Sequence, residues 1–83
     1  MLVSKPAWFS VVAKRHGDVW LEVISGGDKG RCISVPVHDS RYDLEVEHTL
    51  ENVRVGDECE LTLCSASEEA PSWVIDDVLD VQK

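Results

Sequence analysis

The stretch 50–65, with sequence LENVRVGDECELTLCS, constrains the fold more than any other part of the chain. A turn at Gly56 precedes Cys59, Leu61 and Leu63, which alternate with polar or charged residues. Successive side chains of a β-strand point to opposite faces, so this alternation predicts a strand with one buried and one solvated face. A glycine bend before a charged, alternating strand is common in small antiparallel barrels of many functions. The stretch therefore predicts architecture and leaves function open.

Length and composition predict one small β-rich domain. The chain has 83 residues, 43% of them hydrophobic, and valine is the most frequent apolar residue. A domain of this size buries only about 60% of the surface that its unfolded chain exposes, so its core must be compact. Because β-branched side chains favour strands, the sequence predicts an all-β fold over residues 1–83. We expect a small antiparallel barrel of five or six strands, with room for a short helical turn.

Charge is unevenly distributed along the chain. The formal net charge is −8, from 8 Lys plus Arg and 16 Asp plus Glu. Residues 1–42 carry six basic and four acidic side chains, for +2, whereas residues 43–83 carry two basic and twelve acidic ones, for −10. An acidic surface keeps a small protein soluble and monomeric. With so few lysines, the composition also resembles that of proteins from salt-loving organisms, which suggests a halophilic source.

The cysteines indicate the compartment. There are three of them, Cys32, Cys59 and Cys64. Residues 1–10 contain no apolar run long enough for a signal peptide or a membrane span. An odd number of cysteines without a leader predicts free thiols and a cytoplasmic location, with no membrane partner.

Residues 7–24 are predicted to form a β-hairpin, and its register depends on the turn. A two-residue turn at His16-Gly17 pairs Lys14 with Val19 and puts Lys14 on the apolar face. A three-residue turn over 15–17, with a left-handed glycine in a bulge, keeps that face apolar and is preferred. The pairs it predicts are Phe9 with Val23, Val11 with Leu21, and Ala13 with Val19. Trp20 and Val12 then lie together on the outward face.

The segments on either side of this hairpin have simpler patterns. Residues 1–6 are predicted to be a loose lead-in, because Pro6 removes a backbone donor. The glycine-rich stretch 25–30 is predicted to be a hairpin loop, since no helical pattern follows it to build a phosphate site. Residues 31–37 are predicted to form a strand that lies at a sheet edge or ends at Pro36, because Pro36 cannot donate to a neighbouring strand.

Residues 43–48, DLEVEH, alternate again and are interpreted as a strand with Leu44 and Val46 inward. A helix within 40–53 is the competing interpretation, because some of the same residues also fit helical spacing.

The C-terminal part is predicted to be a polar loop at 65–72 and a closing segment at 73–81. Alternation breaks at Asp76-Asp77, so a bulged strand is preferred over a short helix. Together the strands resemble an OB-type or SH3-like barrel in overall plan.

Metal-ligand spacing is not found in the sequence. Structural zinc sites usually pair cysteines two to four residues apart, whereas Cys59 and Cys64 are five apart and Cys32 stands alone. The three histidines fall in different elements. The sequence therefore predicts no metal and no cofactor.

Catalysis is not predicted either. His38-Asp39 beside Cys32 or Cys64 is one conceivable triad, but nothing in the spacing selects it, and a chain this short has little room for a walled pocket. The carboxylate pairs Glu68-Glu69 and Asp76-Asp77 do not match a calcium-loop pattern and are interpreted as solvated surface. We expect a protein that is not an enzyme.

The remaining candidate site is a basic and aromatic group on and beside the hairpin. Its residues are Lys14, Arg15, Trp20, Lys29 and Arg31. Small barrels that bind single strands place exposed aromatics among basic groups, so that bases stack while phosphates are neutralised. The acidic net charge opposes this use, although molar salt shortens the Debye length to about 3 Å.

Two functions are therefore carried forward. The first is a non-catalytic interaction module that binds a protein partner through the Trp20 face or an exposed strand edge. The alternative is a barrel that binds single-stranded nucleic acid, RNA in particular, through the hairpin face. For Trp20 itself, cover by the N-terminal segment or a neighbouring loop is preferred over exposure to a ligand. The sequence leaves the partner and the oligomeric state open.

Overall fold

The computed structural model describes residues 2–65 and 72–82 of the chain. Within these ranges the elements are β1 (Leu2–Val3), β2 (Ala7–Arg15), β3 (Asp18–Val23), β4 (Cys32–Pro36), α1 (Leu44–Asn52), β5 (Glu58–Ser65) and β6 (Val74–Gln82). All strand pairings are antiparallel. No helix in this described part combines the length and the apolar character needed to cross a bilayer.

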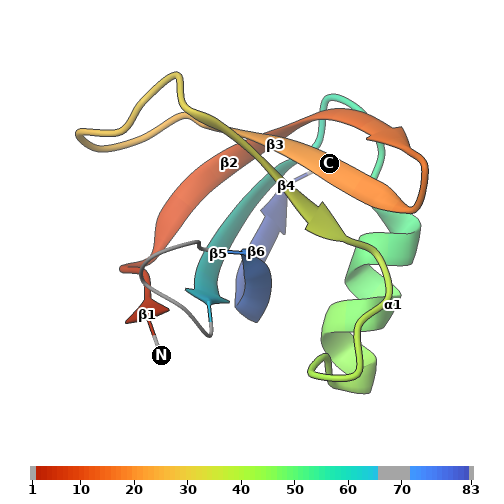
Figure 1. Cartoon of the computed structure of the whole chain (residues 1–83). Coiled ribbons are helices and arrows are strands. Elements are labelled where there is room, and N and C mark those ends of the chain that lie inside the picture. The colour runs from red at the N-terminus through yellow and green to blue at the C-terminus, as the bar shows by residue number, and fades with distance from the viewer. Residues whose placement is uncertain (1, 66–71, 83) are drawn as a thin grey trace.

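β5 is the central strand of one curved sheet (Figure 1). It pairs with β6 along one edge and with β2 and β1 along the other, while β3 and β4 continue beyond β2. Across the described residues β4 pairs with β3 alone and β6 with β5 alone. The prediction of a small, mostly β fold is confirmed. The sheet is open between β4 and β6, however, where the sequence predicts a closed barrel.

The pattern of β5 is confirmed by its burial. Cys59, Leu61 and Leu63 are buried, and the turn before the strand places Gly56 at φ +99°. The core gathers the inward side chains of the sheet and of α1. Its buried members are Phe9, Val11, Val19, Leu21, Val23, Val35, Val46, Leu50, Val53, Cys59, Leu61, Leu63 and Ile75.

The hairpin combines features of both predicted registers. Its turn has two residues, His16 and Gly17, both with positive φ, so the three-residue turn is wrong. Lys14 accordingly pairs with Val19 and points to the inner side of the sheet. A bulge at Val12 then shifts the register by one. Beyond the bulge the predicted pairs of Phe9 with Val23 and Val11 with Leu21 are confirmed, whereas Ala13 pairs with Trp20 instead of Val19.

Residues 44–52 form a helix, so the strand prediction for 43–48 is wrong and the competing helix is confirmed. Asp43 caps it, because its Oδ1 accepts a hydrogen bond of 2.8 Å from the backbone N–H of Val46. Val46 and Leu50 are four residues apart, lie on one helix face and are buried. Leu44, expected to point inward, is 86% exposed.

The closing strand is confirmed as β6, and its broken alternation is explained by bulges. The register against β5 shifts twice, between Glu60 and Leu61 and between Thr62 and Leu63. One shift leaves Asp76 as an extra residue, and Asp76 and Asp77 are both exposed.

The N-terminal segment is less loose than expected. Its residues 2 and 3 pair with β5 as β1, and Ser4 N donates to Leu63 O at 2.8 Å. The predicted loop at 65–72 and the Glu68-Glu69 pair fall largely on residues 66–71, which lie outside the described part.

Candidate binding site at the open edge of the sheet

The open edge of the sheet is the side of β4 that faces away from β3. Val23 N donates to Arg31 O at 2.8 Å and Val37 N donates to Gly17 O at 2.9 Å, so odd-numbered residues around β4 bond to β3. In an antiparallel pair, the backbone groups of the intervening residues point the other way. The N–H groups of Cys32 and Ser34 therefore face away from β3. We call the space between this edge and the start of β6 the seam.

Tyr42 joins the two sides of the seam at one end. Its hydroxyl donates to Pro36 O at 2.8 Å, at the end of β4, and accepts a bond of 3.4 Å from Ile75 N in β6. Burial raises the pKa of this phenol to about 12, and the hydrogen bond from Ile75 opposes the rise. One side chain thus replaces strand pairing between β4 and β6 at this end.

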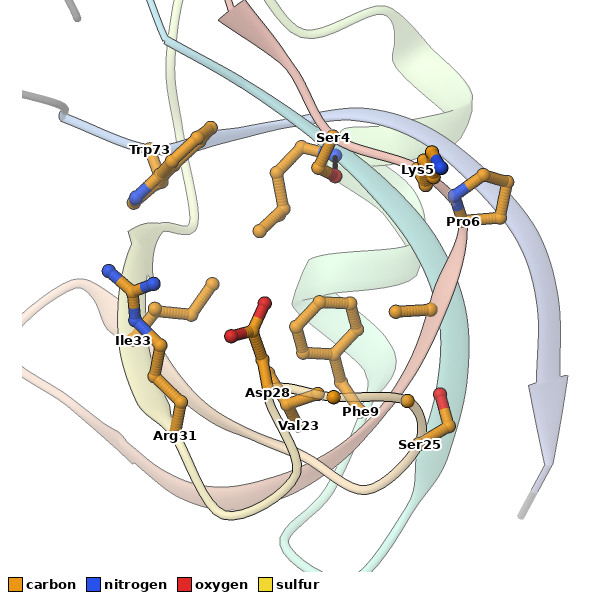
Figure 2. Close-up of a pocket in the computed structure, with 14 residues that line it drawn as sticks. Ser4, Lys5, Pro6, Phe9, Val23, Ser25, Asp28, Arg31, Ile33 and Trp73 are labelled. Atoms are coloured by element: carbon orange, nitrogen blue, oxygen red, sulfur yellow. Dashed lines mark hydrogen bonds between the residues drawn. The ribbon is translucent and has the colours of Figure 1, made fainter.

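A pocket of about 450 Å³ lies at the other end of the seam. Figure 2 shows its labelled side chains as a ring around an opening, with Trp73 and Arg31 on one side and Pro6 and Ser25 across from them. The apolar part of its lining is Ala7, Phe9, Val23, Ile33, Leu63 and Trp73. A groove of about 370 Å³ continues from it along residues 31–34 of the open edge, with Ser72 and Trp73 on its far side. The backbone donors of β4 therefore lie next to an apolar pocket.

Polar groups stand around the pocket. Ser4 Oγ accepts from Leu63 N and Ser25 Oγ accepts from Trp8 N, both at 2.9 Å, so each hydroxyl keeps its proton for a further partner. Lys5 and Arg31 bring two positive charges to the lining and Asp28 brings one negative charge. Within the described residues no ion pair involves these three side chains. The lining is thus weakly positive in a protein whose formal charge is −8.

The structure separates the residues that the sequence proposed as one site. Lys14 is used internally, since its Nζ donates to the carbonyls of Val53 at 2.9 Å and Glu51 at 3.2 Å, at the C-terminal end of α1. Arg15 is at the hairpin tip, whereas Lys29 and Arg31 belong to the loop at the other end of β3. Five residue steps of strand, roughly 17 Å at about 3.3 Å each, lie between these ends. Arg31 alone among the five lines the pocket.

Trp20 lies on the outer face of the sheet, as expected. It is 38% exposed beside Val12, which is 42% exposed. Its neighbours two positions away on β3, Asp18 and Glu22, share that face and are acidic. Among the basic candidates Arg15, which pairs with Asp18, shares this face, whereas Lys14 points to the inner side. One basic and two acidic side chains therefore lie around Trp20, and this surface is apolar and net negative.

In the conceivable triad Asp39 is held by Arg41 and Cys64 is buried, whereas Cys32 is exposed. Both oxygens of Asp39 accept from Arg41, at 2.8 and 2.9 Å, and these hydrogen bonds lower the pKa of Asp39 to about 2. Burial raises the pKa of Cys64, which favours the unreactive thiol form. None of Cys32, Cys59 and Cys64 forms a disulfide.

Sequence reasoning missed the pocket because its parts are far apart in the chain. Lys5 and Pro6 come from the lead-in, Arg31 from a loop and Trp73 from the entry to β6. An edge strand at 31–37 was the one available signal, through Pro36. Comparisons with models of protein families, with curated proteins and with solved structures find no match to this chain.

Proposed function

We propose that this domain is a non-catalytic interaction module that binds an extended segment of a partner protein along the seam. The observation that carries the proposal is the open edge of β4 beside an apolar pocket. Extended peptides add to exposed sheet edges through backbone hydrogen bonds, while pockets for alternate side chains supply specificity. Cys32 and Ser34 would supply the backbone donors.

The pocket suggests the chemistry of the bound segment. Its volume, about 450 Å³, falls within the range of about 300–1,000 Å³ typical of ligand pockets. Its apolar lining suits one aliphatic or aromatic side chain of the partner. Lys5 and Arg31 outnumber Asp28 in the lining, so a carboxylate next to that apolar side chain is favoured.

Binding at this place would also complete the sheet. A partner strand between β4 and β6 would bring the domain closer to the closed OB-type or SH3-like barrel that the sequence suggests. Three cysteines without a disulfide fit a reducing, cytoplasmic setting for this interaction.

Single-stranded RNA is the alternative ligand, and the charge distribution favours the protein partner. Stacking on Trp20 would bring phosphates close to Asp18 and Glu22, while Lys14 is held at the end of α1. Affinity for phosphate backbones depends on clustered Lys and Arg side chains. Here Lys14 and Arg15 lie near the hairpin turn, whereas Lys29 and Arg31 lie in the loop at the other end of β3.

The test is selection of binders from a random peptide library, followed by amide chemical-shift mapping on the labelled protein. We expect a consensus with one apolar residue beside an acidic one, and shifts along residues 31–34 and at Trp73. Ser34→Pro removes one outward donor at an edge where proline is tolerated, and should weaken binding about tenfold, the upper range for one hydrogen bond. Trp20→Ala is the matched control on the outer face.

Two outcomes would overturn the proposal. One is a selected peptide whose affinity falls with Trp20→Ala and is unchanged by Ser34→Pro, in variants that both keep the native amide spectrum. The other is saturable binding of an RNA oligonucleotide with no peptide selected.

A further inference from the structure

Three potential metal ligands meet outside the seam, on the solvent side of α1. Glu47 and Glu51 are one helical turn apart, and His38 comes from the connection between β4 and α1. His38 Nδ1 lies 3.6 Å from Glu47 Oε2 and 3.7 Å from Glu51 Oε1. One ligand atom from each of the three residues lies within 4.8 Å of the others. Two separate segments thus bring an imidazole and two carboxylates together.

The spacing of these atoms fits coordination better than direct hydrogen bonding. Hydrogen bonds between N and O are usually 2.7–3.2 Å long, shorter than both distances from His38. Zinc bonds to imidazole nitrogen and carboxylate oxygen are about 2.0–2.2 Å, so ligand atoms at the corners of a tetrahedron are about 3.4 Å apart. The two distances from His38 need to shorten by only a few tenths of an ångström, roughly, to reach that value. The two carboxylates, within 4.8 Å of one another, need to approach by up to about 1.4 Å through rotation of their side chains.

The charges of Glu47 and Glu51 also favour a bound cation. Carboxylates at positions i and i+4 of a helix repel one another, so Glu47 and Glu51 are unfavourable in the absence of a cation. In the described part of the chain neither carboxylate has an ion pair with Lys or Arg. The nearby Lys14 ammonium bonds to the backbone carbonyl of Glu51 and not to its carboxylate. A divalent ion would neutralise both acidic groups at once.

We propose that His38, Glu47 and Glu51 form a binding site for one divalent transition-metal ion, zinc in the first instance. One nitrogen and two oxygen ligands suit zinc and its neighbours in the first row better than calcium or magnesium, which prefer oxygen alone. His38 and Glu51 are exposed and Glu47 is half-buried, so water can complete the coordination. The ion would tie the connection after β4 to α1, which makes its role structural.

The experiment measures zinc binding to the full chain, freed of metal by a chelator that is then removed. Cys32→Ser is used as the background, because an exposed thiol also binds zinc. Calorimetry should give one zinc per chain, with a rise in melting temperature, and magnesium should give neither. Imidazole nitrogen shifts should identify His38 as the ligand.

Matched variants make the assignment specific. His38→Gln and the double change Glu47→Gln with Glu51→Gln should each weaken zinc binding by about tenfold or more, since even the groups that support metal ligands are worth that much. His48→Gln removes an exposed imidazole from the same helix and should leave binding unchanged. The proposal fails if there is no one-to-one saturation, if binding survives His38→Gln, or if His48→Gln weakens it equally.

Discussion

Replacing Lys14 with methionine tests whether this residue belongs to the fold or to a ligand site. The change keeps the apolar stem and removes the ammonium that donates to Val53 O and Glu51 O. Hydrogen bonds from charged groups contribute about 1.5–3 kcal/mol, and a cation at a helix C-terminus about 0.3–1 kcal/mol. Because Lys14 is exposed, the lower ends apply, and we expect a loss of about 1.5 kcal/mol in unfolding free energy.

This loss converts into a measurable change in melting temperature. An unfolding entropy of about 2.1 cal/mol/K per residue gives about 0.17 kcal/mol/K for a chain of 83 residues. The expected fall is therefore about 9 °C, measured by calorimetry or by circular dichroism of the helix. Lys29→Met is the control, because Lys29 is exposed in the loop and its side chain has no hydrogen bond or ion pair in the described structure.

The control should lose less than about 0.5 kcal/mol, as is usual for surface changes. Equal melting temperatures for the two variants would refute the role of Lys14 at the end of α1. Lys14 would then again be a candidate for binding a ligand.

Three further outcomes are expected. Tyr42→Phe should cost about 1 kcal/mol at neutral pH. The folded pKa of Tyr42, about 12, lies above its ordinary value of 10.0, so this stabilisation is complete below pH 10 and is lost as the pH rises through 12. Because Tyr42 is half-exposed, the loss of unfolding free energy is limited to about 1 kcal/mol. Chemical denaturation as a function of pH should show this loss in the original protein and not in Tyr42→Phe. A maleimide should label exposed Cys32 in the folded protein, and buried Cys59 and Cys64 only on unfolding, as mass spectrometry would show. Amide shift titration with mixed-sequence single-stranded RNA, at low and at molar KCl, should give no saturable shifts around Trp20 at either salt.

Strands whose pattern is local were predictable. β5 alternates without interruption, and Pro36 identifies β4 as an edge strand, so both follow from single segments. α1 was only the second choice because Leu44 and Val46 mimic the alternation of a strand. Two features favour the helix: the Asp43 cap and the four-residue spacing of Val46 and Leu50. That spacing stabilises a helix only when both side chains are buried against the sheet, which the sequence alone does not show.

The sites were less predictable for the same reason. In a strand Glu45 and Glu47 would share a face, whereas in α1 Glu47 and Glu51 do, so the strand interpretation hid the acidic pair beside His38. Lys14 was assigned to the wrong face because a three-residue turn keeps the inner face apolar. The fold instead accepts Lys14 there, since the end of α1 offers it carbonyl partners.

The Val12 bulge has a consequence for how this hairpin can change in length. The turn fixes the pairing of Lys14 with Val19, while the base of the hairpin keeps Phe9 opposite Val23, and the extra residue at Val12 reconciles the two. A chain that lost Val12 alone would keep every pairing of the hairpin, because three residues would then lie between Phe9 and Lys14, as between Val19 and Val23. Loss of one residue from a regularly paired stretch of strand would instead turn apolar side chains to water. A change in length by one residue is therefore tolerated at this bulge, which makes the hairpin a place where related sequences can differ in length without loss of the fold.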